Sequence, residues 1–255
     1  MIKNIIIFFV LFFSLISCVS KKKIVYMNDI PNNKTIDNIL SYEAKLQPDD
    51  MLSIIVSAEN PELTIPFNMP QIQINYSVVG NQTSIKTYLI DYNGFIDYPV
   101  VGKIKMAGLT KSEANLEIVK KISEYFKTPP SVNLSIVNFK ISVLGEVQRS
   151  GTFPITSNRI TVLEALTMAG DLTIFGNRKN VLIIRESNGQ KSFNRIDLTN
   201  SSFIESPYYY LTQNDVVYVE PNKTVVNNSA IGSNISVLLS VTSVFFSILV
   251  FLIKK

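Results

Sequence analysis

The sequence predicts an α+β fold, with two small mixed modules between two apolar chain ends. Short β-rich runs alternate with two helices between residues 42 and 221, and each helix begins with a capping box, Thr110-x-x-Glu113 or Thr161-x-x-Glu164. Phe is concentrated at the ends, with four of the 15 within residues 8–13 and three within residues 245–251. We therefore expect a water-soluble α+β body between two membrane-directed segments.

Residues 1–17 are typical of a bacterial signal peptide. The apolar stretch at residues 5–13 is too short to span a bilayer comfortably, and Leu15-Ile16-Ser17-Cys18 resembles a lipoprotein lipobox. Cys18 is the only Cys in the chain, so we expect cleavage before it and lipid attachment to it. The alternative is an uncleaved anchor with a chance Cys. Val19 at the next position favours sorting to the outer membrane, by analogy with other lipoproteins.

Two polar segments are expected to connect these parts. Residues 18–41 are predicted to form a tether, because they are rich in Asn and bury too little apolar surface to order themselves. The cluster Lys21-Lys22-Lys23 within it either contacts membrane phosphates or is simply solvated. Residues 222–232 are predicted to form a second linker.

Residues 233–253 carry no charge and are predicted to form a transmembrane helix. A helix of this length spans about 31 Å, close to the hydrocarbon thickness of a bilayer. Serines recur along it at steps of three and four and form one stripe: Ser233, Ser236, Ser240, Ser243 and Ser247. The stripe either packs against another helix, with each hydroxyl bonded to its own backbone, or lines a lumen in a ring of identical helices. Both interpretations imply a homo-oligomer.

The first module is predicted to cover residues 42–139. Its expected strands are residues 51–56, 86–90, 95–98, 102–106 and 132–136. Asn93-Gly94 predicts a hairpin that joins the second and third of these strands. The Thr110 capping box opens a helix that we expect to bury one apolar face, made of Leu116, Val119, Ile122 and Phe126.

The second module is predicted to cover residues 140–221. Its expected strands are residues 141–147, 152–155, 181–184, 193–196 and 216–219. Its helix is expected at residues 162–169 and stops at Gly170. Two strands, a helix and further strands is the order of a small β-grasp domain.

A short pattern occurs twice in the chain. Leu46 and Leu211 are each followed four residues later by an Asp, Asp50 or Asp215, and then by apolar strand residues. An Asp that bonds the backbone of its own turn explains both occurrences. They are either related elements or convergence on common turn chemistry.

Ordered motifs along residues 42–221 resemble the bacterial polysaccharide biosynthesis/export family, the Wza-type outer-membrane exporters. The matching motifs are Leu46-x-Pro48-Asp49-Asp50, Asp91-Tyr92-Asn93-Gly94-Phe95, Gly108-Leu109-Thr110, Val143-Leu144-Gly145-Glu146-Val147 and Leu163-Glu164-Ala165-Leu166. The resemblance implies a polysaccharide-export domain, then an SLBB-like β-grasp domain, and a ring, typically an octamer, whose C-terminal helices cross the outer membrane. It also implies a polysaccharide substrate and an inner-membrane polysaccharide co-polymerase, or chain-length regulator, as partner.

Three features depart from the larger members of that family. Asp49 stands where Gly is usual, one β-grasp module is present rather than two, and the C-terminal segment is more apolar than an amphipathic pore helix. We expect an outer-membrane lipoprotein, with soluble domains in the periplasm, that forms an oligomeric channel for capsular or exopolysaccharide. The alternative is a glycan-binding periplasmic scaffold lipoprotein without its own pore.

Five tyrosines are candidates for stacking on sugars or for contacts between subunits: Tyr92, Tyr98, Tyr208, Tyr209 and Tyr210. The alternative is that tyrosine simply suits the pleated surface of a strand.

Composition argues against catalysis and against several kinds of site. The chain has no His and one Cys, which excludes an imidazole base and a thiolate zinc cluster. A net charge of +4 is too small and too scattered to indicate a nucleic-acid partner. The acidic residues Asp49, Asp50, Asp91 and Asp97 fit turns better than the paired carboxylates of a glycosidase. We therefore expect no enzymatic activity, no cofactor and no metal.

Overall fold

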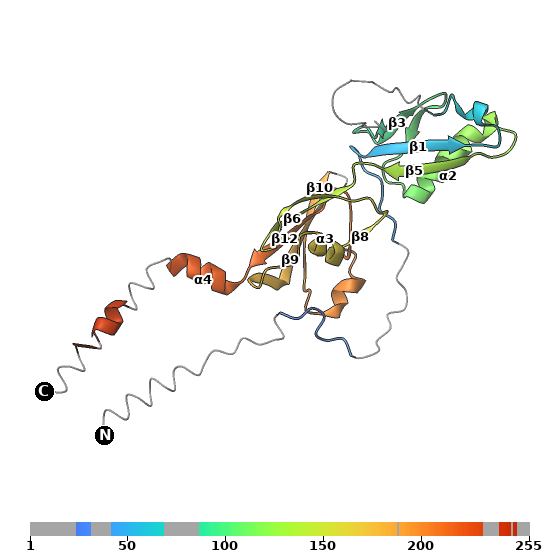
Figure 1. The fold of residues 1–255 in the computed structure, drawn as a ribbon. Helices are drawn as coiled ribbons and strands as arrows, with labels where there is room; N and C mark the ends of the chain where they lie inside the picture. The colour runs from blue at the N-terminus through green and yellow to red at the C-terminus, as the bar shows by residue number, and fades with distance from the viewer. Residues whose placement is uncertain are drawn as a thin grey trace.

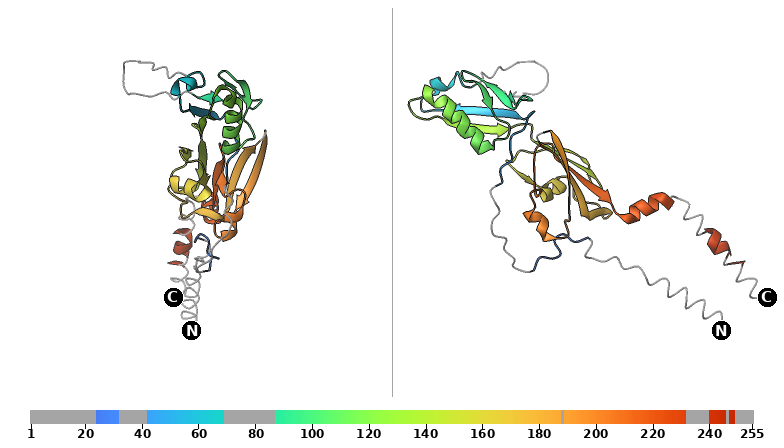
Figure 2. Two further views of the ribbon diagram at one scale, coloured as in Figure 1. Left: turned by 90° about the vertical axis from the view of Figure 1, so that its right-hand side faces the viewer. Right: turned by 180° about the vertical axis from the view of Figure 1, so that it is seen from behind.

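The computed structural model describes residues 24–31, 42–68, 87–187, 189–231, 240–245 and 247–248. Two α+β domains lie end to end (Figures 1 and 2), and each has a hydrophobic core of its own. The first core includes Leu52 and Leu134, and the second includes Val143 and Val217. The expected mixed helix-and-sheet architecture is confirmed.

The first domain is built around a three-stranded sheet of order β2-β1-β5. Its elements are β1 (Met51–Ser57), η2 (Pro61–Thr64), β2 (Tyr88–Leu89), β3 (Phe95–Tyr98), β4 (Gly102–Lys105), α2 (Lys111–Ile122), η3 (Ser123–Tyr125) and β5 (Ser131–Ile136). Side chains of a strand point alternately to its two faces. Leu52, Ile54 and Val56 of β1 are therefore buried against the face that α2 covers.

The helix α2 begins as predicted but buries a different face. Thr110 accepts a hydrogen bond from the Glu113 N–H, and the Glu113 carboxylate accepts one from the Thr110 N–H, so the capping box is confirmed. The buried residues are Ala114, Ile118 and Ile122, whereas Leu116 is 69% exposed. Residues four apart form one row along a helix, and a residue two positions away points to the opposite side. The expected burial of Leu116 is therefore wrong.

The Asn93-Gly94 turn is present, but the strand pairing expected from it is wrong. The Asp91 carboxylate accepts a hydrogen bond from the Phe95 N–H at 2.8 Å, which closes the turn. The strand β3 then pairs with β4, and β2 pairs with β1. The chain before the turn is held to β1 because the Ile90 N–H donates to the Asp50 carbonyl.

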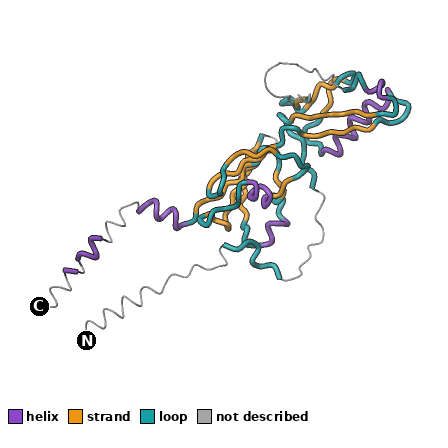
Figure 3. The backbone as a smooth tube through the Cα atoms, viewed as in Figure 1, coloured by secondary structure: helices purple, strands orange, loops and turns teal. Residues whose placement is uncertain are grey.

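The second domain contains a five-stranded sheet of order β10-β9-β12-β6-β7, in which only the β12–β6 pair is parallel. Figure 3 shows that strands make up much of this domain. Its elements are β6 (Lys140–Gly145), β7 (Gly151–Pro154), β8 (Ile160–Thr161), α3 (Val162–Met168), β9 (Gly176–Ser187), β10 (Gln190–Ile196), η4 (Ser201–Glu205), β11 (Tyr210–Leu211) and β12 (Val216–Pro221). The predicted order of two strands, a helix and further strands is present, with the short β8 added directly before α3. Strand β9 is longer than expected, because it continues on both sides of the apolar run at residues 181–184.

Residues 24–31 lie within the expected tether, yet they pack on the second domain (Figure 1). The Met27 and Asn28 N–H groups donate to the carbonyls of Leu198 and Thr199, each at 3.0 Å. The Asp29 carboxylate accepts hydrogen bonds from the Ser201 N–H and hydroxyl at 2.7 and 2.8 Å. These bonds, together with the packing of Tyr26 and Met27 against the second core, order the segment, so the expectation of a solvated tether fails here. The chain thus contacts the second domain at residues 24–31, then forms the first domain, and afterwards forms the second domain itself.

Beyond β12 the chain forms α4 (Lys223–Ile231), where a linker was expected. Residues 240–245 and 247–248 are also helical. Within the residues that the structure describes, no helix combines the length and the apolar character needed to cross a bilayer. Most of the expected span at residues 233–253, including Ser233 and Ser236, lies outside the described residues, as does Cys18.

Candidate functional site

The two repeated turns both form hydrogen bonds with the linker between the domains, around Asn138. On the side of the first turn, the Asn138 side chain accepts from the Met51 N–H at 3.0 Å and donates to the Asp49 carbonyl at 2.9 Å. On the side of the second turn, the Gln213 side chain accepts from the Lys140 N–H at 2.8 Å and donates to the Asn138 carbonyl at 2.9 Å. The linker is therefore held by side-chain amides that each satisfy two backbone groups.

The two turns share one geometry. The Asp50 carboxylate accepts from the Gln47 N–H at 2.8 Å, and the Asp215 carboxylate accepts from the Thr212 N–H at 2.7 Å. The residues before them, Asp49 and Asn214, have φ angles of 70° and 63°. The expected bonding of each Asp to its own turn is confirmed. The left-handed backbone at Asp49 also explains why Gly suits that position.

The two buried aspartates differ in their charge partners. Asp215 forms an ion pair with the Arg185 guanidinium at 2.7 Å, and the same guanidinium donates to the Tyr210 carbonyl at 2.8 Å. The second oxygen of Asp50, Oδ1, has no hydrogen-bond partner among the described residues. Burial raises the pKa of Asp50 to about 6, against a smaller opposing effect of the Gln47 N–H bond. The first turn therefore holds a buried carboxyl group with a raised pKa, whereas the equivalent carboxylate in the second turn is paired with a cation.

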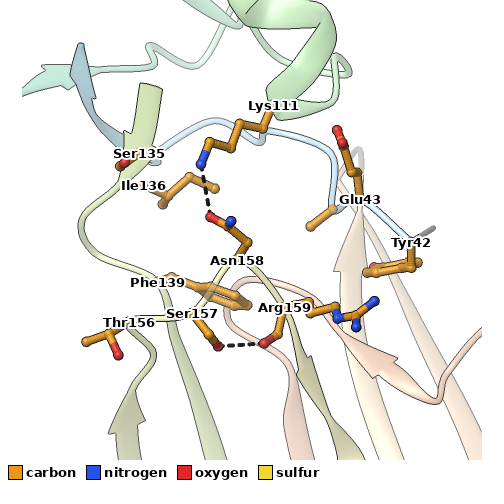
Figure 4. A pocket seen from close by; sticks show the side chains of 11 residues that line it. Tyr42, Glu43, Lys111, Ser135, Ile136, Phe139, Thr156, Ser157, Asn158 and Arg159 are labelled. Atoms are coloured by element: carbon orange, nitrogen blue, oxygen red, sulfur yellow. Dashed lines mark hydrogen bonds between the residues drawn. The ribbon is translucent and has the colours of Figure 1, made fainter. Parts of the chain in front are cut away.

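A cleft of ≈ 140 Å³ lies between the two domains, close to this linker (Figure 4). The first domain contributes Tyr42, Glu43, Ala44, Lys111, Ser135 and Ile136, and the second contributes Phe139, Thr156, Ser157, Asn158 and Arg159. Lys111 reaches from the start of α2 toward Asn158, and its Nζ donates to Asn158 Oδ1 at 2.9 Å. This bond connects the two walls of the cleft.

Glu43 is fixed on the N-terminal end of α2. The Ser112 hydroxyl and N–H donate to its two carboxylate oxygens at 2.6 and 3.2 Å. These bonds lower the pKa of Glu43, with the hydroxyl bond as the largest cause. A carboxylate at this end of a helix is also favoured by the helix dipole. Glu43 is thus a structural anion on the rim of the cleft.

Aromatic rings lie at the edge of the cleft. Tyr42 stacks on Tyr210 with ring centroids 4.9 Å apart and an interplanar angle of 10°. The Arg159 guanidinium lies 5.4 Å from the centre of the Tyr210 ring, and Tyr209 meets Tyr210 edge-on at 5.0 Å. Burial raises the pKa of Tyr42, so its hydroxyl stays protonated at neutral pH. The stacked pair of Tyr42 and Tyr210 therefore connects the start of the first domain with the second domain.

The candidate tyrosines have different environments. Tyr208, Tyr209 and Tyr210 are half-buried, and Arg185 lies 5.1 Å from the Tyr208 ring centre. Tyr92 is 87% exposed at the tip of the Asn93-Gly94 turn. Tyr98 is 2% exposed and packs against the Tyr88 ring inside the first core. As a glycan or subunit contact, Tyr98 is a mistaken candidate in this conformation, because the alternation of β3 turns it inward.

The described part of the serine stripe consists of Ser240, Ser243 and Ser247. The Ser243 hydroxyl donates to the Ser240 carbonyl at 2.8 Å, and the Ser247 hydroxyl donates to the Ser243 carbonyl at 2.9 Å. Such bonds to the preceding turn occupy the hydroxyl proton and leave the oxygen as an acceptor.

Sequence reasoning missed the cleft itself. Tyr42, Lys111 and Arg159 are far apart in the chain, and none belongs to a motif that predicts a shared site. The tyrosines at residues 208–210, at one edge of the cleft, were selected from the sequence. No pattern in the sequence indicated that Tyr42 stacks on one of them. Only the contact between the domains brings these residues together.

Comparisons with known proteins agree with this division of the chain. The family model of the polysaccharide biosynthesis/export protein matches residues 40–137, and that of the SLBB domain matches residues 139–219. The two matches meet at the linker that the repeated turns hold. They bear out the predicted order of an export domain followed by an SLBB domain.

Two curated relatives share the name EPS I polysaccharide export outer membrane protein EpsA. The protein from Ralstonia solanacearum is 27% identical over 199 residues, which are 75% of this chain and 52% of the relative. The protein from Ralstonia nicotianae is 32% identical over 142 residues, which are 53% of this chain and 37% of the relative. The alignments thus span about half or less of each relative. Residues 40–137 thus belong to the polysaccharide biosynthesis/export protein family, and residues 139–219 form an SLBB domain.

Proposed function

We propose that this protein exports a capsular or extracellular polysaccharide across the outer membrane. The observation that carries the proposal is the export domain joined directly to an SLBB domain, the order that the family matches give. The names of the two relatives, which describe outer-membrane export of the polysaccharide EPS I, support it. The role is binding and passage of the polymer, without catalysis. Asp50 and Asp91 agree with this role, because their carboxylates bind the backbone of turns.

The proposed location is the outer membrane, with the two domains in the periplasm. The lipobox-like sequence ending at Cys18 would supply a lipid anchor, and residues 233–253 would supply a transmembrane helix. Residues 240–245 and 247–248 are helical, and Val241, Val244, Phe245 and Ile248 are each more than half exposed there. In water such an apolar surface is unfavourable, so it needs a membrane or another helix to cover it.

The proposed assembly is a homo-oligomeric ring, with the octameric order that the family resemblance implies, which works with an inner-membrane chain-length regulator. Serines that bond their own backbone, as Ser243 and Ser247 do, allow close packing of neighbouring helices. Their oxygens still accept hydrogen bonds from sugar hydroxyls. Both uses require copies of the helix to lie side by side.

A second candidate function is a glycan-binding scaffold of a secretion complex that has no pore of its own. The cleft between the domains favours it, because one chain supplies all its walls and no ring is needed. The two candidates differ in their oligomeric state and in their need for the C-terminal helix.

Deletion of the gene, followed by complementation, tests the export proposal. We expect extracellular polysaccharide to fall to background, while lipid-linked or periplasmic polymer persists, and the full chain to restore secretion. Electron microscopy of the detergent-extracted protein should show rings. Normal secretion by the deletion strain would overturn export, and a strictly monomeric protein that still restores secretion would favour the scaffold.

A further inference from the structure

We propose that the cleft between the two domains binds a negatively charged sugar residue, such as a uronate of an acidic polysaccharide. This inference rests on the proposed export function and adds to it the charge of the sugar. It is carried by two cationic side chains that line one cleft from opposite domains, Lys111 and Arg159. Figure 4 shows both among the side chains that surround the cavity.

Among the described residues, neither cation is part of a salt bridge. None of the salt bridges within the described part of the chain includes Lys111 or Arg159. Lys111 donates to the neutral amide oxygen of Asn158, and Arg159 lies over the Tyr210 ring. Glu43, the acidic residue among those that line the cleft, already accepts two bonds from Ser112. The cleft thus has an excess of positive charge.

Both cations also keep hydrogen-bond donors for a ligand. An ammonium group has three N–H donors and a guanidinium has five. The bond from Lys111 to Asn158 uses one of the three. The contact of Arg159 with the Tyr210 ring involves the π-face and leaves its N–H groups for an anion. A carboxylate is the group that accepts such charge-assisted bonds best.

The other walls suit a sugar ring. Phe139 and Tyr42 line the cleft and offer apolar surface for the C–H face of a pyranose, and the hydroxyls of Ser135 and Thr156 offer replaceable hydrogen bonds. The volume of ≈ 140 Å³ corresponds to about five water molecules, which is the scale of one sugar residue. The cleft therefore fits one residue of a longer polymer.

Isothermal titration of the purified full-length protein in detergent tests this site. The probes are a tetramer of galacturonic acid and, as the neutral match, a tetramer of galactose. We expect the acidic tetramer to bind at least tenfold more tightly, with affinity that falls as salt is added. Lys111→Gln and Arg159→Gln should each weaken binding of the acidic tetramer about tenfold. Lys120→Gln, which removes an exposed cation from the same helix outside the cleft, should leave binding unchanged.

Equal binding of the two tetramers, no binding of the acidic one at millimolar concentration, or unchanged binding by both cleft variants would overturn the proposal. Lys111→Arg keeps the charge and should keep most of the affinity, which separates a loss of charge from a loss of folding. Secretion by the wild-type chain is measured separately in cells. Absence of sugar binding with normal secretion rejects the cleft and leaves the export proposal standing.

Discussion

Asp50 and Asp215 occupy equivalent positions in two turns that hold opposite sides of one linker. Both are fully buried, yet only Asp215 has an arginine beside it. The linker residue Asn138 is bonded to both turns, through its side chain to Asp49 and through its carbonyl to Gln213. The orientation of the domains thus depends on a few identifiable hydrogen bonds.

Replacing Asn138 with Ala should loosen this junction. The change removes the solvent-exposed bonds to the Met51 N–H and the Asp49 carbonyl, and such hydrogen bonds contribute about 0.5–1.5 kcal/mol each. We expect a lower free energy of unfolding in urea and faster proteolysis within residues 137–140. Asn133→Ala, at an exposed position of β5, is the matched control and should change neither quantity.

The raised pKa of Asp50 should make stability depend on pH. Its pKa is about 6 in the folded chain, against 3.8 for an unperturbed Asp, so the folded form binds the proton more tightly than the unfolded chain does. The stabilisation is complete below about pH 4 and is lost as pH rises through about 6. Relative to Asp50→Asn, the wild type should therefore lose about 2–3 kcal/mol between pH 4 and pH 7. Urea unfolding of both proteins at several pH values measures this difference, and parallel curves would contradict it.

The Arg185–Asp215 pair should behave in a different way. Asp215→Asn leaves a guanidinium that is 14% exposed without its carboxylate, which should cost about 3–5 kcal/mol in the free energy of unfolding. Arg185→Met combined with Asp215→Asn should cost less than the sum of the single changes, because neither charge is then left unpaired. Additive losses in this cycle would mean that the pair is not coupled.

Asp49→Gly should stabilise the first turn. Asp49 has a φ angle of 70°, a conformation that costs residues with a Cβ more than it costs Gly. We expect a gain of about 0.5–1 kcal/mol in the free energy of unfolding. Asp49→Ala is the control, since it keeps the Cβ and removes the polar side chain, and it should be destabilising. A loss of stability with Gly would show that the Asp49 side chain matters more than the backbone.

The serine stripe can be tested in cells. Replacing Ser236, Ser240, Ser243 and Ser247 together with Leu should stop polysaccharide export while the protein stays membrane-bound. Leu has no hydroxyl to accept a hydrogen bond, and its larger side chain prevents neighbouring helices from packing closely. Leu at Val237, Val241 and Val244, which lie outside the serine stripe, is the control and should preserve export. Continued export by the serine variant would mean that export needs neither the hydroxyl acceptors nor the small side chains of the stripe.

Local chemistry predicted much of the fold. Both capping boxes formed, because Thr110 and Thr161 bond residues three positions ahead and need no distant partner. The repeated turns were predicted for the same reason. The hairpin partner of β3 and the buried face of α2 were not, since strand pairing and helix rotation depend on what lies opposite.

The candidate site was predicted only in part. The tyrosines at residues 208–210 were selected, but Tyr98 proved to be a core residue and Tyr42 had no pattern that marked it. Arg185 and Arg159 gave no signal either, because a lone arginine in a sequence does not reveal whether it meets a carboxylate, a ring or a cavity.

The packing of residues 24–31 on the second domain sets an order of events during synthesis. Asp29 bonds Ser201, which the ribosome adds 172 residues later. Residues 24–31 therefore cannot bind the second domain while the first domain is being synthesised. The segment can dock only once residues 198–201 are present, so its attachment follows the completion of the first domain.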